Sequence, residues 1–388
     1  GERDDGKGGT FFWELVLGNP AFLIGQGNTN GSLFGATDIQ VRPAPRNGDG
    51  PDPAEDEIVL AAFGGARDDG LFISANGGGR WFQVFDESGA SDDELHRIDT
   101  PAQGRMTIAF GPRQSGPDDG VVYVLMARNG DTFGMPEAAL DIPFGAVINV
   151  FGADMEDLVV DRDTDDDTII LDVRLPFEPR LDLDDTDPLN PLNPLLLSNP
   201  LISGVCRPDG VFTPRLSQGW YDNIIAVDPA DENVVWVGGI DLFRSDDAGV
   251  SFGLASYWYL ENNLDLNPMD EEYLDRYVHA DQHAIVFHPG YDGVTNTVVF
   301  VTNDGGIFKT ENARAGTHPV GCIEFEDVDP VPDDDVFDYR VLPGSLPEVL
   351  WESLNNGYEV TQFYHGDTGT TTAPNGRDMF VGGTQDNG

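Results

Sequence analysis

The stretches Ser74-Ala-Asn-Gly-Gly-Gly-Arg-Trp81 and Ser245-Asp-Asp-Ala-Gly-Val-Ser-Phe252 decide the fold of this chain. Both read Ser-x-Asp/Asn-x-Gly-x-polar-aromatic, and both follow an apolar segment that contains Leu-Phe. Asp and Asn side chains cap their own turns, and glycine permits a positive φ. The closing aromatic residue is suited to packing back between strands. The two stretches therefore predict two equivalent turns, each joining a pair of antiparallel strands.

Apolar segments of strand length surround these turns and recur along the chain. The 47 glycines and 27 prolines are typical of many short strands joined by turns. We predict an all-β fold built from four-stranded antiparallel units, with an irregular period of about 50–80 residues. The units are expected at 37–85, 106–125, 223–252, 282–353 and 361–381.

Four-stranded sheets repeated in series form a β-propeller, and each sheet is one blade. We predict blades in 1–128, a long acidic and Pro-rich insertion at 129–217, and further blades in 218–388, with the chain ending inside a blade. An unclosed ring leaves edge strands unpaired. We therefore expect further blades from a longer protein or from another chain.

The chain is strongly acidic, with 69 Asp and Glu against 21 Lys and Arg and a net charge of −48. Phosphate contacts need the opposite sign, so we expect no nucleic-acid partner. No apolar run reaches the roughly 18 residues of a membrane span, so no membrane insertion is expected. A surface adapted to high salt and a surface loaded with divalent cations both explain the charge. The near-absence of lysine, with only Lys7 and Lys309, favours adaptation to salt.

Two cysteines, Cys206 and Cys322, are too few for a disulfide scaffold, and one bridge or two separate thiols remain open. The acidic run 161–167 in the insertion has alternating carboxylates, which can coordinate Ca²⁺. It lacks the glycine and the glutamate that complete an EF-hand loop, so a solvated loop is the favoured interpretation.

A series of motifs in the C-terminal part carries a family resemblance. They are Gln218-Gly-Trp-Tyr-Asp-Asn223, the turn at Ser245, His279-Ala-Asp-Gln-His-Ala284, Asn303-Asp-Gly-Gly306, Leu354-Asn-Asn-Gly357, Gln362-Phe-Tyr364 and Gly382-Gly-Thr-Gln-Asp-Asn-Gly388. Their order resembles the secreted propellers related to sortilin (the VPS10 type), whose turn is the Asp-box or BNR repeat. It is also similar to the propeller halves of xyloglucan-active glycoside hydrolases. The likeness covers 218–388 well and 1–128 loosely.

The resemblance implies a secreted or cell-surface protein with a site at the mouth of the propeller channel. First-strand starts and the loops between second and third strands meet there, and ligands commonly bind in such concave sites. The expected ligand-binding residues are Tyr221, Asp222, Gln362, Tyr364 and His365. Sortilin-type propellers bind ligands without chemistry, so the expected partner is an extracellular protein or a polysaccharide.

His279, Asp281 and His283 alternate, and on an extended strand they would share one side. Two imidazoles and a carboxylate are ligands for Zn or Mn, so a divalent metal is one interpretation. The alternatives are a hydrogen-bonded strand start that ties adjacent blades and direct contact with the ligand.

Asp304 follows an apolar strand and precedes Gly-Gly. The resemblance to the xyloglucanases implies that it is one catalytic carboxylate, with Asp386 in the equivalent loop one blade later. Hydrolysis of a glycoside needs two carboxyl groups ~5–10 Å apart. Ordinary Asp-Gly turn chemistry explains the same residues.

Three functions therefore remain open. The first is a salt-adapted, sortilin-like propeller that binds protein or glycan at the channel mouth. The second is an endo-acting glycoside hydrolase on neutral β-glucan. The third is a structural surface or filament subunit assembled by strand pairing between chains.

Overall fold

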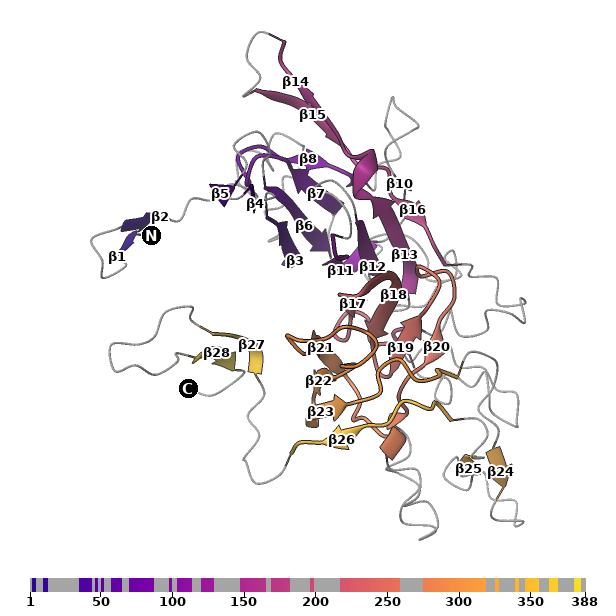
Figure 1. Cartoon of the computed structure of the whole chain (residues 1–388). Helices are drawn as coiled ribbons and strands as arrows, with labels where there is room; N and C mark the ends of the chain where they lie inside the picture. Colours follow the sequence, from indigo (N-terminus) through magenta and orange to yellow (C-terminus); the bar gives the residue numbers. More distant parts are fainter. Residues whose placement is uncertain are drawn as a thin grey trace, which may run out of the picture.

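Four antiparallel sheets dominate the computed structural model of the 388-residue chain (Figure 1). The structure describes residues 2–4, 10–12, 35–43, 46–47, 50–51, 57–64, 70–86, 98–99, 103–113, 120–128, 147–164, 169–181, 196–198, 217–258, 275–318, 325–327, 339–341, 346–355, 363–368 and 380–384. Within these residues the labelled elements are strands, apart from the short 3-10 helix η2 (Met155–Asp157). None of the described helices is long and apolar enough to span a membrane.

Each of the four sheets has four strands in chain order, and every pairing is antiparallel. Blade 1 contains β3 (Gly35–Arg42), β6 (Ile58–Gly64), β7 (Gly70–Ser74) and β8 (Phe82–Gln83). Blade 2 contains β11 (Gln103–Phe110), β12 (Val121–Arg128), β13 (Val147–Asp154) and β16 (Glu178–Pro179). Blade 3 contains β17 (Ile224–Asp228), β18 (Asp231–Gly238), β19 (Leu242–Ser245) and β20 (Gly253–Leu254). Blade 4 contains β21 (Gln282–Phe287), β22 (Val299–Asn303), β23 (Gly306–Thr310) and β26 (Glu352–Ser353).

These sheets confirm the predicted all-β fold of four-stranded blades. The remaining strands form smaller sheets of two strands each. They are β1 (Glu2–Asp4) with β2 (Thr10–Phe12), β4 (Arg46–Asn47) with β5 (Gly50–Pro51), β9 (Phe85–Asp86) with β10 (Ile98–Asp99), β14 (Val159–Arg162) with β15 (Ile170–Arg174), β24 (Phe325–Asp327) with β25 (Tyr339–Val341), and β27 (Phe363–Thr368) with β28 (Phe380–Thr384).

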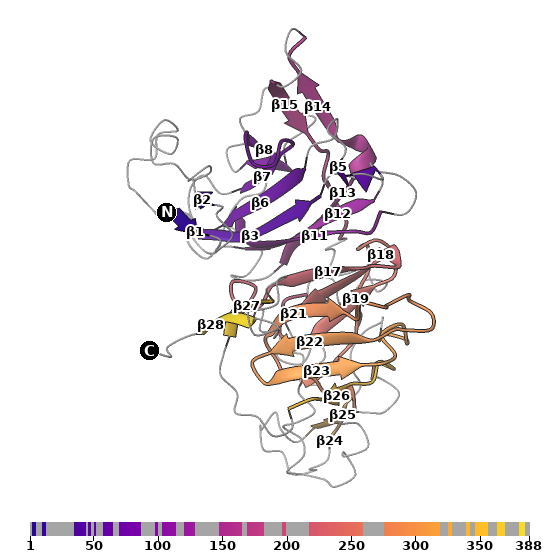
Figure 2. The same ribbon diagram turned by 60° about the vertical axis from the view of Figure 1, so that its left-hand side comes forward.

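The segment 129–217, predicted as an insertion, also supplies two strands of blade 2. Its β13 pairs with β12 over seven residue positions, and β16 pairs with β13. Among the described residues, the part that departs from the blade pattern is the hairpin β14–β15, which extends away from the sheets in Figures 1 and 2. The sequence did not show these strands because the second unit carries no Ser-x-Asx turn after its third strand. Cys206 and Cys322 lie outside the described residues, so their pairing stays a prediction.

Each inner blade buries both faces of its sheet. On β12, Val122, Val124 and Met126 pack against blade 1, whereas Tyr123 and Leu125 pack against blade 3. The core between blades 3 and 4 is built in the same way, around Trp236, Trp351 and Phe308. Successive residues of a strand point to opposite faces, so an uninterrupted apolar strand fits only between two neighbouring sheets.

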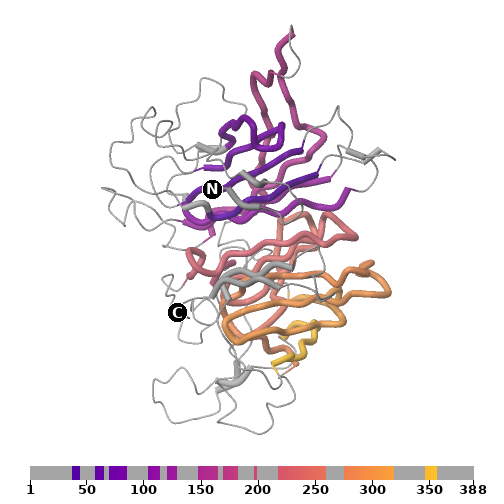
Figure 3. Tube along the Cα trace, turned by 90° about the vertical axis from the view of Figure 1, so that its left-hand side faces the viewer, coloured from indigo at the N-terminus to yellow at the C-terminus, as the bar shows by residue number. Residues whose placement is uncertain are grey.

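The first strands of the blades, β3, β11, β17 and β21, lie side by side in chain order (Figures 2 and 3). The two end blades are different, because among the described four-stranded sheets each has a neighbour on one face alone. Ile39 and Val41 on β3 are 60% and 50% exposed, and Val286 on β21 is 53% exposed. The described blades thus form an arc whose two ends present apolar residues.

The two turns singled out in the sequence make the same hydrogen bonds. Ser245 Oγ accepts the N–H groups of Asp247 (3.2 Å) and Gly249 (2.9 Å) and donates to Asp247 Oδ1 (2.7 Å). Ser74 makes the equivalent three contacts with Asn76 and Gly78. Gly249 has a φ of +84°, which favours glycine at that position. Both serines are fully buried, so each turn is held by hydrogen bonds inside the end of its blade.

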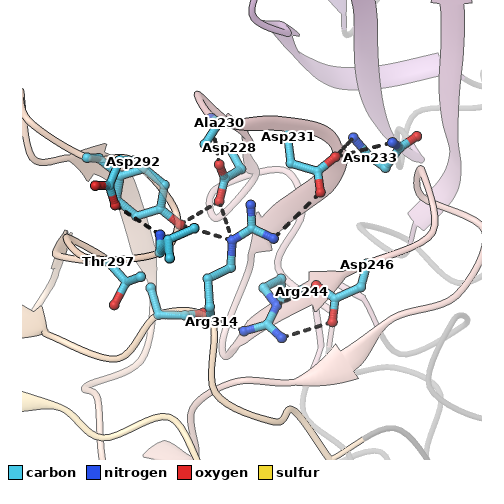
Figure 4. A network of polar contacts seen from close by, with 12 residues as sticks. Asp228, Ala230, Asp231, Asn233, Arg244, Asp246, Asp292, Thr297 and Arg314 are labelled. Atoms are coloured by element: carbon cyan, nitrogen blue, oxygen red, sulfur yellow. Dashed lines mark hydrogen bonds and ion pairs between the residues drawn. The ribbon is translucent and has the colours of Figure 1, made fainter.

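Blades 3 and 4 are also joined by charged groups at the end of β17 (Figure 4). The buried Asp228 accepts from Tyr291 OH (2.5 Å) and pairs with Arg314 (2.8 Å). Arg244, which is 3% exposed, pairs with Asp246 (2.9 Å) and lies over the ring of Trp236. Partnered charges of this kind are required wherever an ionised group is removed from water.

We predict that Ser245→Ala lowers the free energy of unfolding by about 1–3 kcal/mol, because a buried N–H and a carboxylate each lose a partner. Ser251→Ala is the matched control, since its hydroxyl contacts the same Asp247 from the exposed side. That control should change stability by less than about 0.5 kcal/mol. Urea denaturation of the three proteins measures both effects. Equal effects of the two substitutions would show that the buried hydroxyl does not hold the turn.

Candidate functional site

The candidate site lies at the end of blades 3 and 4 where β17 and β21 begin. A tight turn precedes β17, with the N–H groups of Tyr221 and Asp222 both donating to the carbonyl of Gln218 (2.6 and 2.8 Å). The turn between β22 and β23, which carries Asp304, opens at the same end, because β21 and β22 pair with Gln282 opposite Asn303. Residues far apart in the chain thus meet at one end of the blades, which we call the mouth.

Asp304 is the centre of the polar contacts at the mouth. It accepts from Tyr221 OH (3.0 Å) and from His283 Nε2 (2.6 Å), and the two rings pack edge to face at 5.2 Å. Since a carboxylate only accepts hydrogen bonds, His283 carries its hydrogen on Nε2. Asp304 thereby joins Tyr221 of blade 3 to His283 of blade 4.

Asp222 is fully buried, and neither of its carboxylate oxygens receives a hydrogen bond from a protein donor. Burial, together with a hydrogen bond to Asp281 that needs a proton, raises the pKa of Asp222 to about 10. Asp281 in turn accepts from the amide of Gln218 (3.2 Å). Beneath the mouth, therefore, a neutral carboxyl group lies against an acidic neighbour.

Arg105 of blade 2 reaches the same region, where its guanidinium donates to the carbonyl of Tyr221. The electrostatic attraction of Arg105 lowers the pKa of Asp222 but is outweighed by burial and by Asp281. Burial also raises the pKa of Tyr221, and its hydrogen bond to Asp304 adds to the shift. Tyr221 therefore stays a neutral donor at physiological pH.

The predicted metal triple does not have the assumed geometry. β21 begins only at Gln282, and Asp281 has a left-handed backbone with a φ of +67°. His279, Asp281 and His283 consequently do not alternate along one extended strand, and the premise of a shared side is wrong. Over the described ranges no group of three or more His, Cys, Asp or Glu is arranged to hold a metal ion. A bound Zn, Mn or Ca ion stays a prediction.

His279 has a packing role instead. A Cβ on Gly305 would come within 2.3 Å of the His279 ring, so the glycine allows the imidazole to close over the turn. His279 Nδ1 also contacts the carbonyl of Ala280 (3.0 Å). Asn355 completes the turn, with bonds to the carbonyl of Gly305 and the N–H of Ile307 (both 2.9 Å). The Gly-Gly after Asp304 is therefore needed for packing.

Of the predicted site residues, the structure brings together Tyr221, Asp222, Asp281, His283 and Asp304. Gln362 and Asp386 lie outside the described residues, so neither the pairing of Asp386 with Asp304 nor the role of Gln362 is tested. Tyr364 and His365 lie on β27, where only the backbone is described.

Three polar residues that connect neighbouring blades through hydrogen bonds were not identified from the sequence. The buried Asn223 donates to the carbonyl of Arg105 (3.0 Å) and accepts from Thr107 (2.7 Å). The buried Gln282 donates to the carbonyl of Ile240 (3.2 Å), and Asp38 accepts from the N–H of Ile108 (2.8 Å). Their common signal is one polar residue at or near the start of each first strand.

Comparisons with known proteins give a likeness to solved structures. No family model and no curated protein matches the chain. A similar solved structure is YCF48 from Cyanidioschyzon merolae, at 13% sequence identity and a TM-score of 0.19. The match covers 64% of this chain and 63% of that chain, which is less than two thirds of its length. The propeller-like fold therefore rests on the strand pairing described above.

We predict that Asp222→Asn raises the free energy of unfolding near pH 7 by roughly 2–4 kcal/mol, at 1.36 kcal/mol per pKa unit. The side-chain amide would donate to Asp281 without needing a proton. Below the ordinary pKa of 3.8, wild-type Asp222 is protonated in both states and adds no pH dependence. As the pH rises toward 10, the unfolded chain releases this proton and the folded chain keeps it, so the wild type is progressively destabilised.

Urea denaturation at several pH values tests this, and the gain in the variant should grow from about pH 4 toward pH 10. Glu311→Gln is the control, because Glu311 is 74% exposed on blade 4. Its pH profile should follow that of the wild type. A variant that is less stable than the wild type at pH 7 would contradict the assignment of a neutral Asp222.

Proposed function

We propose that this chain is a binding propeller that recognises an extracellular protein or glycan at the mouth. The observation that carries the proposal is the convergence of Tyr221, His283 and Asp304, from two blades, on one polar opening. Trp220 lies beside Tyr221, with ring centroids 5.8 Å apart, and is 52% exposed. Aromatic rings next to fixed polar groups are typical of ligand sites.

The relationship to sortilin-type propellers belongs to this proposal. It is supported by the matching hydrogen bonds of the turns at Ser74 and Ser245, which are those an Asp-box would make. A secreted or cell-surface location follows from the same resemblance.

We predict that Trp220→Ala weakens binding to the retained ligands by about tenfold, the effect of losing one aromatic contact at an interface. The experiment displays basic, neutral and acidic peptides, together with neutral oligosaccharides, and measures which of them the wild type retains. Val294→Ala is the matched control, because Val294 is 84% exposed in the loop at the opposite end of blade 4. Retention that is insensitive to Trp220 would place the binding site elsewhere.

Adaptation to high salt is also part of the proposed function. A net charge of −48 makes the folded chain repel itself, and salt shortens the range of that repulsion from about 10 Å at 0.1 M to about 3 Å at 1 M. We predict that KCl raises the midpoint of urea unfolding over this range. Sucrose is the control, since it is excluded from protein surfaces without screening charge. Stabilisation by sucrose but not by KCl would contradict the proposal.

Assembly with further blades is the second candidate function. The exposed Ile39 and Val41 on blade 1, and Val286 on blade 4, would be covered if another blade packed on each end of the arc. The inner blades show what such packing looks like, because both of their faces are buried. A sedimentation measurement on the full chain distinguishes a monomer from an assembly closed by a second copy.

A further inference from the structure

We propose that the ligand group held at the mouth is the positively charged side chain of a lysine or arginine in a protein partner. This inference rests on the proposed function and names the chemistry of its ligand. The residues that carry it are Trp220, Tyr221, Asp222, Asp281 and Asp304, and together they are called the mouth cluster.

The basic side chains near the mouth cluster are His283, which contacts Asp304, and Arg105, which attracts Asp222 without an ion-pair contact. Over the described part of the chain, no lysine or arginine forms an ion pair with Asp222, Asp281 or Asp304. The described guanidinium nearest in the network, Arg105, is engaged by the carbonyl of Tyr221. Elsewhere the protein does pair its acids, as Asp228 does with Arg314. Carboxylates that are not paired with a lysine or arginine of the protein can accept hydrogen bonds from a cationic ligand group.

A second observation is independent of the surface acids. Asp222 is completely buried behind the mouth, and both of its oxygens lack a donor from the protein. Burying such a group is unfavourable unless something compensates it. Asp281 is the neighbour of this buried group, since it shares a hydrogen bond with Asp222 and accepts another from the side-chain amide of Gln218. A cation beside Asp281 would compensate the acidic charge next to Asp222.

The aromatic residues complete the fit. Trp220 is half exposed and packs beside Tyr221, so an exposed ring adjoins the tyrosine that bonds to Asp304. An ammonium or guanidinium group is attracted both to aromatic faces and to carboxylates. The net charge of −48 would in addition steer a basic segment toward the protein. A neutral sugar would use the rings but would leave the acids uncompensated.

The test uses the full chain and a short peptide containing lysine and arginine, capped at both ends. Binding is compared with that of a neutral version, in which lysine is acetylated and arginine is replaced by citrulline, and with a neutral β-glucan oligosaccharide. The variant of the mouth cluster is Asp281→Asn with Asp304→Asn. Asparagine keeps the acceptor for Gln218 and Tyr221 and tolerates the left-handed backbone at Asp281, so the fold should be retained.

The matched control is Glu311→Gln with Glu352→Gln. It also removes two negative charges, but from the two glutamates that pair with Lys309 elsewhere on blade 4. Unfolding midpoints verify that both variants fold. We expect the basic peptide to bind the wild type and the control within about twofold of each other, and the mouth variant about tenfold or more weakly. Repeating the titration at high salt separates local contacts from steering.

Three results overturn the inference. Equal weakening in both double variants would mean that the peptide responds only to total charge. Equal binding of the basic and the neutral peptide would mean that charge is not recognised. Binding of the oligosaccharide alone, lost in the mouth variant or in Trp220→Ala, would leave the proposed function in place and make its ligand a glycan. If no probe depends on the mouth, the proposed function itself fails.

Discussion

The whole structure depends on sheets that are apolar on both faces. In β12 every residue is buried, and so are the last five residues of β18, Val234–Gly238. Alternate residues belong to alternate cores, as Tyr123 and Val124 do on β12. A sheet of this kind is unfavourable alone in water, because both of its apolar faces would be exposed. Packing the sheets one after another buries both faces of each inner sheet. The same packing produces the arc of blades and leaves an apolar face at each end of it.

Packing in series also creates the mouth. When sheets stack with their first strands side by side, the starts of those strands come together at one end of the arc. Backbone N–H and C=O groups at these strand starts have no partner on a neighbouring strand. Side chains must therefore form hydrogen bonds with them. Asn223 and Gln282 do this by bonding into the preceding blade. The neighbouring residues Tyr221, Asp281 and His283 are thereby held in place at the opening.

Charge gives this opening its chemical character. The acids near the opposite end of blade 3 are paired with Arg314 and Arg244, whereas those of the mouth cluster face tyrosine, histidine and one another. The buried Asp222 is the most unfavourable member of the set, because burial and Asp281 both oppose its charge. In our proposal, these acids beside the exposed ring of Trp220 make the mouth a binding site for cationic groups.

The blades could be predicted from the sequence because their signals are local. Ser245 bonds to residues two and four positions ahead, and strand alternation is visible within a few residues. Tyr221 and Asp304 were also predicted to share one end of the propeller, from strand order alone. Their hydrogen bond, however, joins residues 83 positions apart, and local patterns carry no distances on that scale. The third and fourth strands of blade 2 were missed because no turn motif marks them.

Only the tertiary structure decided which of the candidates act together. The left-handed backbone at Asp281 breaks the alternation that had suggested a metal site. The burial of Asp222 depends on neighbours from blades 2 and 4, so its missing donors and its raised pKa were invisible in a sequence of mostly exposed acids. Sequence alone therefore determined the repeated blades and the acidic surface, since turns, strand periodicity and net charge are local or additive properties. Burial, partner geometry and pKa shifts depend on contacts between distant segments, so the structure had to decide them.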